Sequence, residues 1–174
     1  IPLTGTLVSG TYDDLNIKTY SHGMFTSVFD YPFLSSSANH IFDLTAGYPA
    51  ASSLSGTEAT TVQQSKKNNI YNQMAQVLSG FDTTGSVQEF DQDGNFAAGG
   101  TKYQNVFFIN YARLLAKDEI QKGTYSLSLY VSGTYASANS AKEITDAGAA
   151  TSFKVNSPAG EYGILYATAS AGTG

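Results

Sequence analysis

The sequence predicts an α+β fold in which mainly antiparallel strands carry one principal amphipathic helix and are joined by long polar loops. An apolar stripe at helical spacing runs through residues 58–79. Short segments of alternating apolar and polar residues recur elsewhere, most clearly at residues 125–131, and glycine or serine clusters separate them. A chain of 174 residues is long enough to bury one core, so residues 1–174 are predicted to form a single domain.

The first third of the chain is predicted to consist of short strands. Residues 1–20 are typical of an extended arm with one or two strands, because Leu15, Ile17 and Thr19 alternate with polar neighbours. Residues 24–31 carry aromatic and β-branched side chains suited to a strand, which Pro32 ends. Phe33 and Leu34 are then expected in the core. A turn over residues 35–39 leads to a strand over residues 40–48 that stops at Gly47.

The helix is predicted over residues 58–79. Gly80 follows the last apolar position, where a left-handed C-cap is common, and Ser55 or Thr57 is the expected N-cap. The opposite face carries amides instead of the usual mixture of Glu and Lys. This face is either plainly solvated or a surface that contacts other backbones without burying charge. The apolar stripe consists of Ile70, Tyr71, Met74, Val77 and Leu78, and the amide face of Asn68, Asn69, Asn72, Gln73 and Gln76.

The remainder of the chain is predicted to form hairpins and loops. Asp93-Gly94 is expected to be a hairpin turn, and residues 106–109 and 125–131 are expected to be strands. Residues 110–123 fit either a continued strand or a helical turn, and we favour the helical turn. The Ala/Ser-rich stretch 134–152 predicts a long loop, followed by a strand pair around residues 153–155 and 162–166.

Composition excludes several classes of protein. The chain has no cysteine, so disulfides and thiolate chemistry are excluded. Its net charge is −5 and Arg113 is the only arginine, which argues against nucleic-acid binding. No apolar run reaches the length of a membrane span, so no membrane association is expected. The chain begins Ile1-Pro2 instead of with Met, which indicates either removal of a preceding segment or a part of a longer product.

No catalytic residue is predicted. The two histidines are His22 and His40, and no G-x-S-x-G nucleophile motif is present. His40 is expected to be a turn histidine bonded to a backbone carbonyl. The adjacent carboxylates at 13–14 and 118–119 point to opposite faces of an extended strand, so neither pair makes a convincing acid and base couple. We therefore predict that the protein is not an enzyme and uses no cofactor or small-molecule substrate.

Residues 90–96, FDQDGNF, resemble a calcium-binding loop in part. Asp91, Asp93 and Asn95 offer oxygen atoms at alternate positions. An EF-hand loop needs its glycine at the sixth position and a glutamate at the twelfth, whereas Gly94 is fourth and no glutamate follows in range. A hairpin turn is the better interpretation, and no metal site is predicted.

The chain is rich in aromatic residues and poor in charge. It has 12 tyrosines and 10 phenylalanines, and 13% of its residues are charged, about half of the ~25% typical of soluble domains. This composition fits a secreted β-rich protein or a subunit buried among neighbours. The aromatic residues could form a carbohydrate-binding platform, but a core and a protein interface explain them better.

Several blocks of the sequence resemble virion structural proteins of the large contractile-tailed phages (myoviruses) that infect cyanobacteria. These blocks are SVFDYPFLSSSANHIFDLTAGY at 27–48, KKNNIYNQMAQVLSGFD at 66–82 and VFFINYARLLAKDEIQKGTYSLSL at 106–129, with a weaker block, EYGILYATASAG, at 161–172. They cover about half of the chain. They are stretches of likeness that contain no catalytic motif.

The resemblance implies a non-enzymatic assembly subunit in the tail or baseplate region of a virion assembled in the host cytoplasm. Its partners would be other virion proteins and copies of itself. Residues 35–39 would present small uncharged groups to a neighbouring chain, while Phe29 and Phe42 anchor the turn in the core. The alternatives are a receptor- or carbohydrate-binding module on a tail fibre or cell surface, a cell-wall-degrading enzyme of a tail tip, and a secreted bacterial surface protein.

Overall fold

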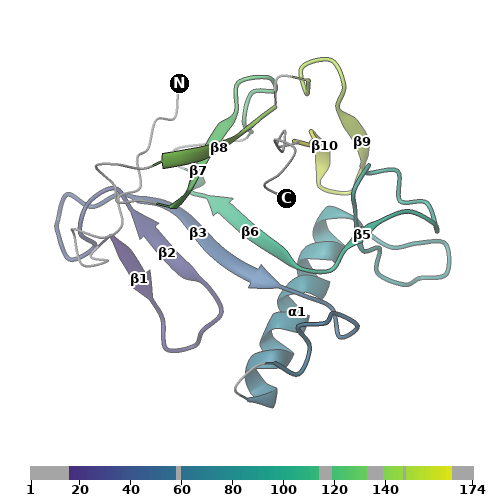
Figure 1. Ribbon diagram of the computed structural model, residues 1–174, viewed down its shortest axis with the longest axis horizontal. Coiled ribbons are helices and arrows are strands. Elements are labelled where there is room, and N and C mark those ends of the chain that lie inside the picture. Colours follow the sequence, from purple (N-terminus) through teal and green to yellow (C-terminus); the bar gives the residue numbers. More distant parts are fainter. Residues whose placement is uncertain (1–15, 58–59, 114–118, 133–138, 147, 166–174) are drawn as a thin grey trace.

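The computed structural model describes residues 16–57, 60–113, 119–132, 139–146 and 148–165, and its largest element is a four-stranded antiparallel sheet (Figure 1). The strand order is β1-β2-β3-β6. The strands are β1 (Ile17–Thr19), β2 (Thr26–Phe29), β3 (His40–Gly47) and β6 (Val106–Tyr111). The α+β prediction is confirmed. The strands predicted around residues 17–19, 24–31, 40–48 and 106–109 all form, but residues 1–15 of the predicted arm lie outside the described residues.

The central strand β3 pairs with β2 on one side and β6 on the other. Leu44 lies opposite both Thr26 and Ile109, and the pairing with β6 continues without a shift from Phe42 to Gly47. Because side chains alternate along a strand, the two faces of the sheet differ. The face toward the helix carries Asp43, Thr45, Gly47, Phe108 and Asn110. The opposite face carries the apolar set Phe42, Leu44, Ala46, Phe107, Ile109 and Tyr111.

The helix α1 (Thr61–Leu78) lies across the end of the sheet where β3 stops and β6 begins (Figure 1). The backbone N–H of Gln63 donates to the hydroxyl of Thr60, which is the N-cap. The expectation of Ser55 or Thr57 as N-cap was therefore wrong. The hydroxyl of Ser55 accepts from Gln64 Nε2 instead, and that of Thr57 donates to the Leu54 carbonyl. The predicted stop is confirmed, since Gly80 has a φ of +81° just after the helix.

The buried face of α1 differs from the predicted stripe. Ile70 and Tyr71 are buried as predicted, but Val77 is 60% exposed and Leu78 is 40% exposed. Ala75 is fully buried in their place. The apolar end of the helix is thus left at the surface, and the predicted amide face is largely exposed, with Asn69, Asn72, Gln73 and Gln76 all accessible.

Helix and sheet meet where Gly47 faces Tyr71. A Cβ atom on Gly47 would lie 2.9 Å from the backbone nitrogen of Tyr71 and 3.2 Å from the ring of Phe108. The absence of a side chain at this position lets β3 approach the helix backbone closely. Tyr71 is the largest fully buried side chain among the described residues, so this contact is the centre of the core.

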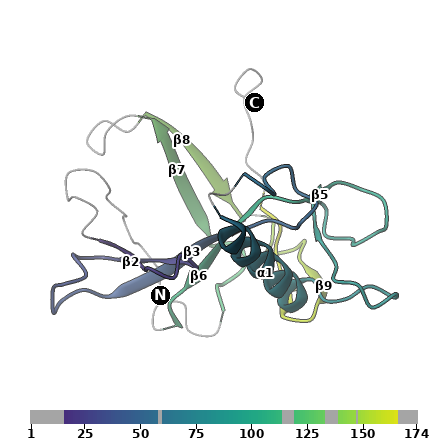
Figure 2. The ribbon, with the colours of Figure 1, turned by 90° about the horizontal axis from the view of Figure 1, so that it is seen from below.

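The stretch 134–152 is not a long loop. Strand β8 (Asn139–Thr145) pairs antiparallel with β7 (Ser126–Ser132), and this ribbon projects away from the sheet (Figure 2). The carboxylate of Asp146 accepts hydrogen bonds from the backbone N–H groups of Gly123 and Tyr125, at 2.9 and 2.8 Å, and so closes the ribbon. Within 110–123, residues 114–118 lie outside the described residues, so the choice between strand and helical turn stays a prediction.

Two further hairpins form at the other end of the molecule. Strand β4 (Phe90–Asp91) pairs with β5 (Lys102–Tyr103), and β9 (Lys154–Ser157) pairs with β10 (Gly160–Tyr162). A final strand pair therefore forms, but its second strand lies earlier than predicted: β10 ends at Tyr162, residues 163–165 are not in a strand, and residue 166 lies outside the described residues. The hairpin around Asp93-Gly94 also forms, but residues 92–101 connect its strands, so the tight turn that we predicted is wrong.

The aromatic segment around Pro32 is only partly buried. Phe29 packs against Phe33 and His40, with ring centroids 6.2 and 5.5 Å apart, and is half-buried. The expectation that Leu34 enters the core is wrong, because this side chain is 83% exposed. The serines at 35–37 are exposed, as the hypothesis of an approachable turn requires.

Candidate functional site

An open groove lies between the end of α1 and the two hairpins that follow it. It has a volume of about 730 Å³. The helix end, the turn after it, the loop between β4 and β5, and β9 each contribute to its walls, and no lining residue is charged. The lining residues are Gln76, Ser79, Gly80, Phe81, Gln88, Asn95, Phe96, Val155, Asn156, Ser157 and Pro158.

The first wall is a turn held by a carboxylate. Phe81 and Val87 form an isolated antiparallel bridge, and Asp82 closes the turn between them. Its Oδ1 accepts from the Thr84 hydroxyl at 2.7 Å and from the Ser86 backbone N–H at 2.9 Å. These hydrogen bonds hold the pKa of Asp82 below its usual value, and the bond from the Thr84 hydroxyl has the largest effect. The turn thereby presents the ring of Phe81 to solvent at 58% exposure.

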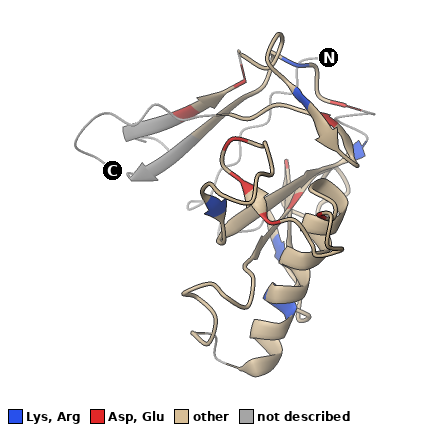
Figure 3. Cartoon of the chain, turned by 90° about the vertical axis from the view of Figure 1, so that its right-hand side faces the viewer, with Lys and Arg blue, Asp and Glu red and all other residues tan. Residues whose placement is uncertain are grey.

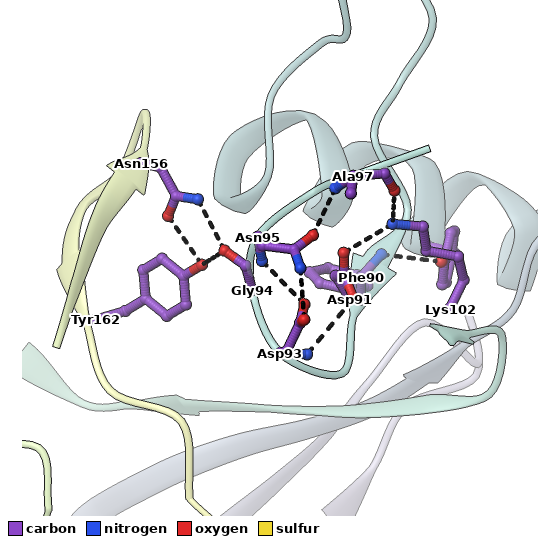
Figure 4. A network of polar contacts seen from close by, with 10 residues as sticks. Phe90, Asp91, Asp93, Gly94, Asn95, Ala97, Lys102, Asn156 and Tyr162 are labelled. Atoms are coloured by element: carbon purple, nitrogen blue, oxygen red, sulfur yellow. Dashed lines mark hydrogen bonds and ion pairs between the residues drawn. The ribbon is translucent and has the colours of Figure 1, made fainter. Parts of the chain in front are cut away.

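The second wall is the loop between β4 and β5, which Lys102 closes at its base (Figure 4). The ammonium group of Lys102 lies 2.7 Å from Asp91 Oδ2 and donates a hydrogen bond to the Ala97 carbonyl at 2.8 Å. The Asp91 side chain is only 2% exposed. The hydrogen bond from Lys102 is the main cause that lowers the pKa of Asp91, so the carboxylate is charged at neutral pH.

Asparagine and aspartate shape the tip of this loop. Asn95 donates to both carboxylate oxygens of Asp93, through its backbone N–H and its Nδ2, and its Oδ1 accepts from the Ala97 N–H. Phe96 lies between these contacts with a φ of +56°, a conformation that a bulky residue adopts only when its surroundings impose it. The loop is therefore built to hold Phe96 in the wall of the groove.

The third wall is anchored on Gly94. Its carbonyl accepts from Asn156 Nδ2 at 2.8 Å and from the Tyr162 hydroxyl at 3.3 Å, which connects the loop to β9 and β10 (Figure 4). Gly94 has a φ of +64°, and a Cβ atom on it would lie 2.7 Å from that hydroxyl, so this position favours glycine. Burial, followed by the charges of Asp91 and Asp93, raises the pKa of Tyr162, so its hydroxyl is protonated at neutral pH and can donate.

This arrangement accounts for the motif that resembled a calcium loop. The carboxylates of Asp91 and Asp93 are engaged by Lys102 and Asn95, and both take part in shaping the loop. Across the residues described, no group of three or more His, Asp or Glu side chains is placed to hold a metal ion.

The groove also presents groups that the fold itself does not use. The side-chain amides of Gln76 and Gln88 make no hydrogen bond to any described residue, whereas those of Asn95 and Asn156 are occupied. Val155 is 71% exposed beside them. An amide offers both a donor and an acceptor without the desolvation cost of a charge, so the groove suits an uncharged partner such as a polypeptide backbone or a neutral sugar.

The two histidines lie elsewhere, on and beside the sheet. His40 Nε2 lies 2.8 Å from Asp43 Oδ1, which also accepts from the Ser27 hydroxyl at 2.6 Å. The expected bond of His40 to a backbone carbonyl is thus replaced by a carboxylate contact. Asp43 thus lies between Ser27 and His40, whereas in a nucleophilic triad the histidine lies between the serine and the aspartate. His22 stacks on Tyr20 at 5.0 Å.

Of the carboxylate pairs considered in the sequence, the structure describes only Glu119, which does not line the groove. Residues 13, 14 and 118 lie outside the described residues, and Glu119 is exposed. Charged residues are thinly scattered over the described part of the molecule (Figure 3). The charged residues of helix α1 are Lys66 and Lys67. Asp82, Asp91 and Asp93 lie in or beside the loops around the groove but do not line it. In the described part of the chain, no helix combines the length and the apolar character needed to span a membrane.

Comparison with known proteins gives no relative: no protein-family model, no curated protein and no solved structure matches this chain.

The pair formed by Asp91 and Lys102 should support the loop strongly. Replacing Asp91 with asparagine is expected to lower the free energy of unfolding by about 1.5–3 kcal/mol at pH 7, the range for a hydrogen bond to a charged group. The folded pKa of Asp91 lies below the unfolded value of about 3.9, so its stabilising contribution is complete above that pH and is lost as the pH falls through the folded pKa.

Urea unfolding of both proteins between pH 7 and pH 3 measures this effect. The difference between wild type and Asp91→Asn should shrink toward pH 3, and Glu119→Gln, at an exposed position, should change little at either pH. A difference that stays constant across this range would mean that the charge of Asp91 does not support the loop.

Proposed function

We propose that the protein is a non-enzymatic structural subunit of a phage virion, in the tail or baseplate region. It acts through assembly contacts with other virion proteins and with copies of itself, in a particle assembled in the host cytoplasm. The proposal includes no nucleic acid, membrane, cofactor or small-molecule substrate. The observation that supports it most is the uncharged groove together with the apolar side chains exposed around it.

Large apolar side chains are exposed at several places on the described part of this chain. Single exposed hydrophobic residues are common on any protein, but contiguous ones mark contact surfaces. Phe81 and Val155 line the groove, whereas Val77 faces a second hollow between α1 and the sheet. Among the described residues, seven large apolar side chains are more than half exposed: Tyr31, Leu34, Val62, Val77, Phe81, Phe107 and Val155.

Uncharged contact surfaces suit a subunit that is held permanently among neighbours. Burying apolar surface stabilises an interface by roughly 25 cal/mol per Å², and burying an amide costs little when it finds a partner. A net charge of −5 on each copy makes the copies repel one another weakly as whole molecules. An interface made of Gln76, Gln88, Phe81 and Val155 adds no like-charge contact to that repulsion.

The proposal is tested in particles of the phage whose genome encodes this chain. Quantitative mass spectrometry of purified particles, and of tails separated from heads, should find the chain in a fixed ratio to the tail proteins. A Phe81→Ser, Val155→Ser double variant should enter particles poorly, while Val62→Ser, equally exposed at the other end of α1, should enter normally. Absence of the wild-type chain from purified particles contradicts the proposal.

A carbohydrate-binding module is the second candidate function. The groove places two phenylalanine rings, Phe81 and Phe96, beside the unused amides of Gln76 and Gln88, and rings and amides are what bind neutral sugars. A glycan array with the purified protein separates the two functions. Saturable binding that is lost in Phe81→Ala would favour the sugar-binding module, and turnover of peptidoglycan by the same protein would instead identify an enzyme.

A further inference from the structure

Strand β6 is an open edge of the main sheet. It is the last strand in the order β1-β2-β3-β6, and no described strand pairs with its second side. The other edge, β1, has three residues including Lys18, whereas β6 has six residues, VFFINY, with no charge and no proline. Its pairing with β3 has no bulge. Short length, charge, proline and bulges are among the features that protect an edge, and β6 has none of these four.

The backbone of β6 shows which groups face outward. The N–H of Ala112, the residue after the strand, donates to the Ile41 carbonyl on the β3 side. Because backbone groups alternate in direction along a strand, residues 106, 108 and 110 also face β3. The N–H and C=O groups of Phe107 and Ile109 therefore point away from the sheet, toward the open edge.

The side chains of the same two residues are accessible. Phe107 is 77% exposed and Ile109 is 37% exposed, and both lie on the apolar face of the sheet, opposite α1. A strand added along this edge would satisfy the outward backbone groups and would also cover part of this apolar surface. A charged partner strand would bury its charges against phenylalanine and isoleucine, so the strand that fits is uncharged.

We infer that β6 pairs antiparallel with β6 of a second copy of this chain, with Phe107 of one copy opposite Ile109 of the other. In this register a two-fold axis relates the two strands, and the outward N–H and C=O groups of Phe107 in one copy face those of Ile109 in the other. The pairing forms on the order of four backbone hydrogen bonds and two cross-strand Phe–Ile pairs. The segment brings no charge to the axis, where two negative chains would otherwise repel. The inference rests on the proposed function, since it specifies how copies of the subunit meet.

The pairing is tested by sedimentation velocity over a range of concentrations of the purified chain. The wild type should form a dimer at high concentration. Ile109→Pro removes one outward N–H but no hydrogen bond of the β3 ladder, and Phe107→Lys brings a positive charge of each copy to the axis. Each variant is expected to weaken the dimer by at least about tenfold. Val62→Lys, at a 61% exposed position on α1, should leave it unchanged.

Circular dichroism of each variant under monomeric conditions shows whether the fold is kept, and Phe107→Lys serves if the proline variant unfolds. A wild type that stays monomeric throughout, or variants that dimerise as tightly as wild type, would overturn the pairing. A monomeric chain still found in purified particles would overturn this inference alone, whereas a β6-dependent dimer absent from particles would overturn the proposed function.

Discussion

Replacing Tyr71 with alanine is expected to lower the free energy of unfolding by about 3–5 kcal/mol, the range for removing a large buried aromatic side chain. Tyr71 is 1% exposed and stacks edge-on against Phe90, with ring centroids 5.4 Å apart. Its hydroxyl donates to the Tyr103 carbonyl at 2.8 Å and accepts from the Phe90 N–H. The side chain thus connects α1 to both strands of the β4–β5 hairpin.

Chemical denaturation of Tyr71→Ala, Tyr71→Phe and Tyr31→Ala measures this effect. Tyr71→Phe keeps the ring and should lose about 1–3 kcal/mol, and Tyr31→Ala, at a 58% exposed position, should lose little. Similar losses for Tyr71→Ala and Tyr31→Ala would contradict a core centred on Tyr71.

We also expect Tyr71 to make the folded protein less stable at high pH. Burial raises the pKa of Tyr71 to about 12 from an unfolded value of about 10. Its stabilising contribution is therefore complete below pH 10 and is lost as the pH rises toward 12.

Gly47→Val is expected to destabilise the protein by about 1–3 kcal/mol, although valine favours strands and glycine does not. The sign follows from the contact with α1, because the added Cβ would meet the backbone of Tyr71 at 2.9 Å and 3.1 Å. A backbone cannot move aside as a flexible side chain can, so the helix would have to shift away from β3.

Thermal and urea unfolding of Gly47→Val, compared with Gly99→Ala, tests this contact. A Cβ on Gly99 meets nothing within 4 Å, so that change should be neutral or slightly stabilising. A stabilised Gly47→Val would show that strand propensity outweighs the contact and that α1 does not lie against β3 as described.

The elements predicted correctly are those with a strong local pattern. Residues 40–47 and 126–132 alternate apolar or aromatic residues with small ones, and Gly80 ends the helix for a reason of backbone geometry. Such signals depend only on neighbouring residues in the sequence, so they can be recognised without knowledge of the fold.

The errors occur where distant residues decide the outcome. Strand β8 has weak strand propensity of its own and is fixed by pairing with β7 and by the contacts of Asp146 with Gly123 and Tyr125. The helix begins at Thr61 with Thr60 as its N-cap, whereas the hydroxyls of Ser55 and Thr57 make other hydrogen bonds. Leu34 is apolar but lies on an exposed turn. None of these partners could be identified from spacing alone.

The groove itself could not be predicted, because residues 76–88, 95–96 and 155–158 meet only in the folded chain. The amide-rich helix face fits either a solvated surface or a contact surface, and Gln76 from this face lines the groove. The sequence predicts a tight turn within residues 90–96, whereas this segment forms part of a longer loop that positions Phe96 and anchors β9 and β10 through Gly94.

The central claim is that this chain acts by burying uncharged surfaces against other proteins. Hydroxyl-radical footprinting of the isolated chain and of the same chain within purified particles tests it directly, because phenylalanine and leucine side chains are oxidised in proportion to their exposure. Phe81, Phe107 and Leu34 are exposed in the isolated chain. We expect oxidation of Phe81 and Phe107 to fall sharply in the particle. Equal oxidation in both samples would contradict the account.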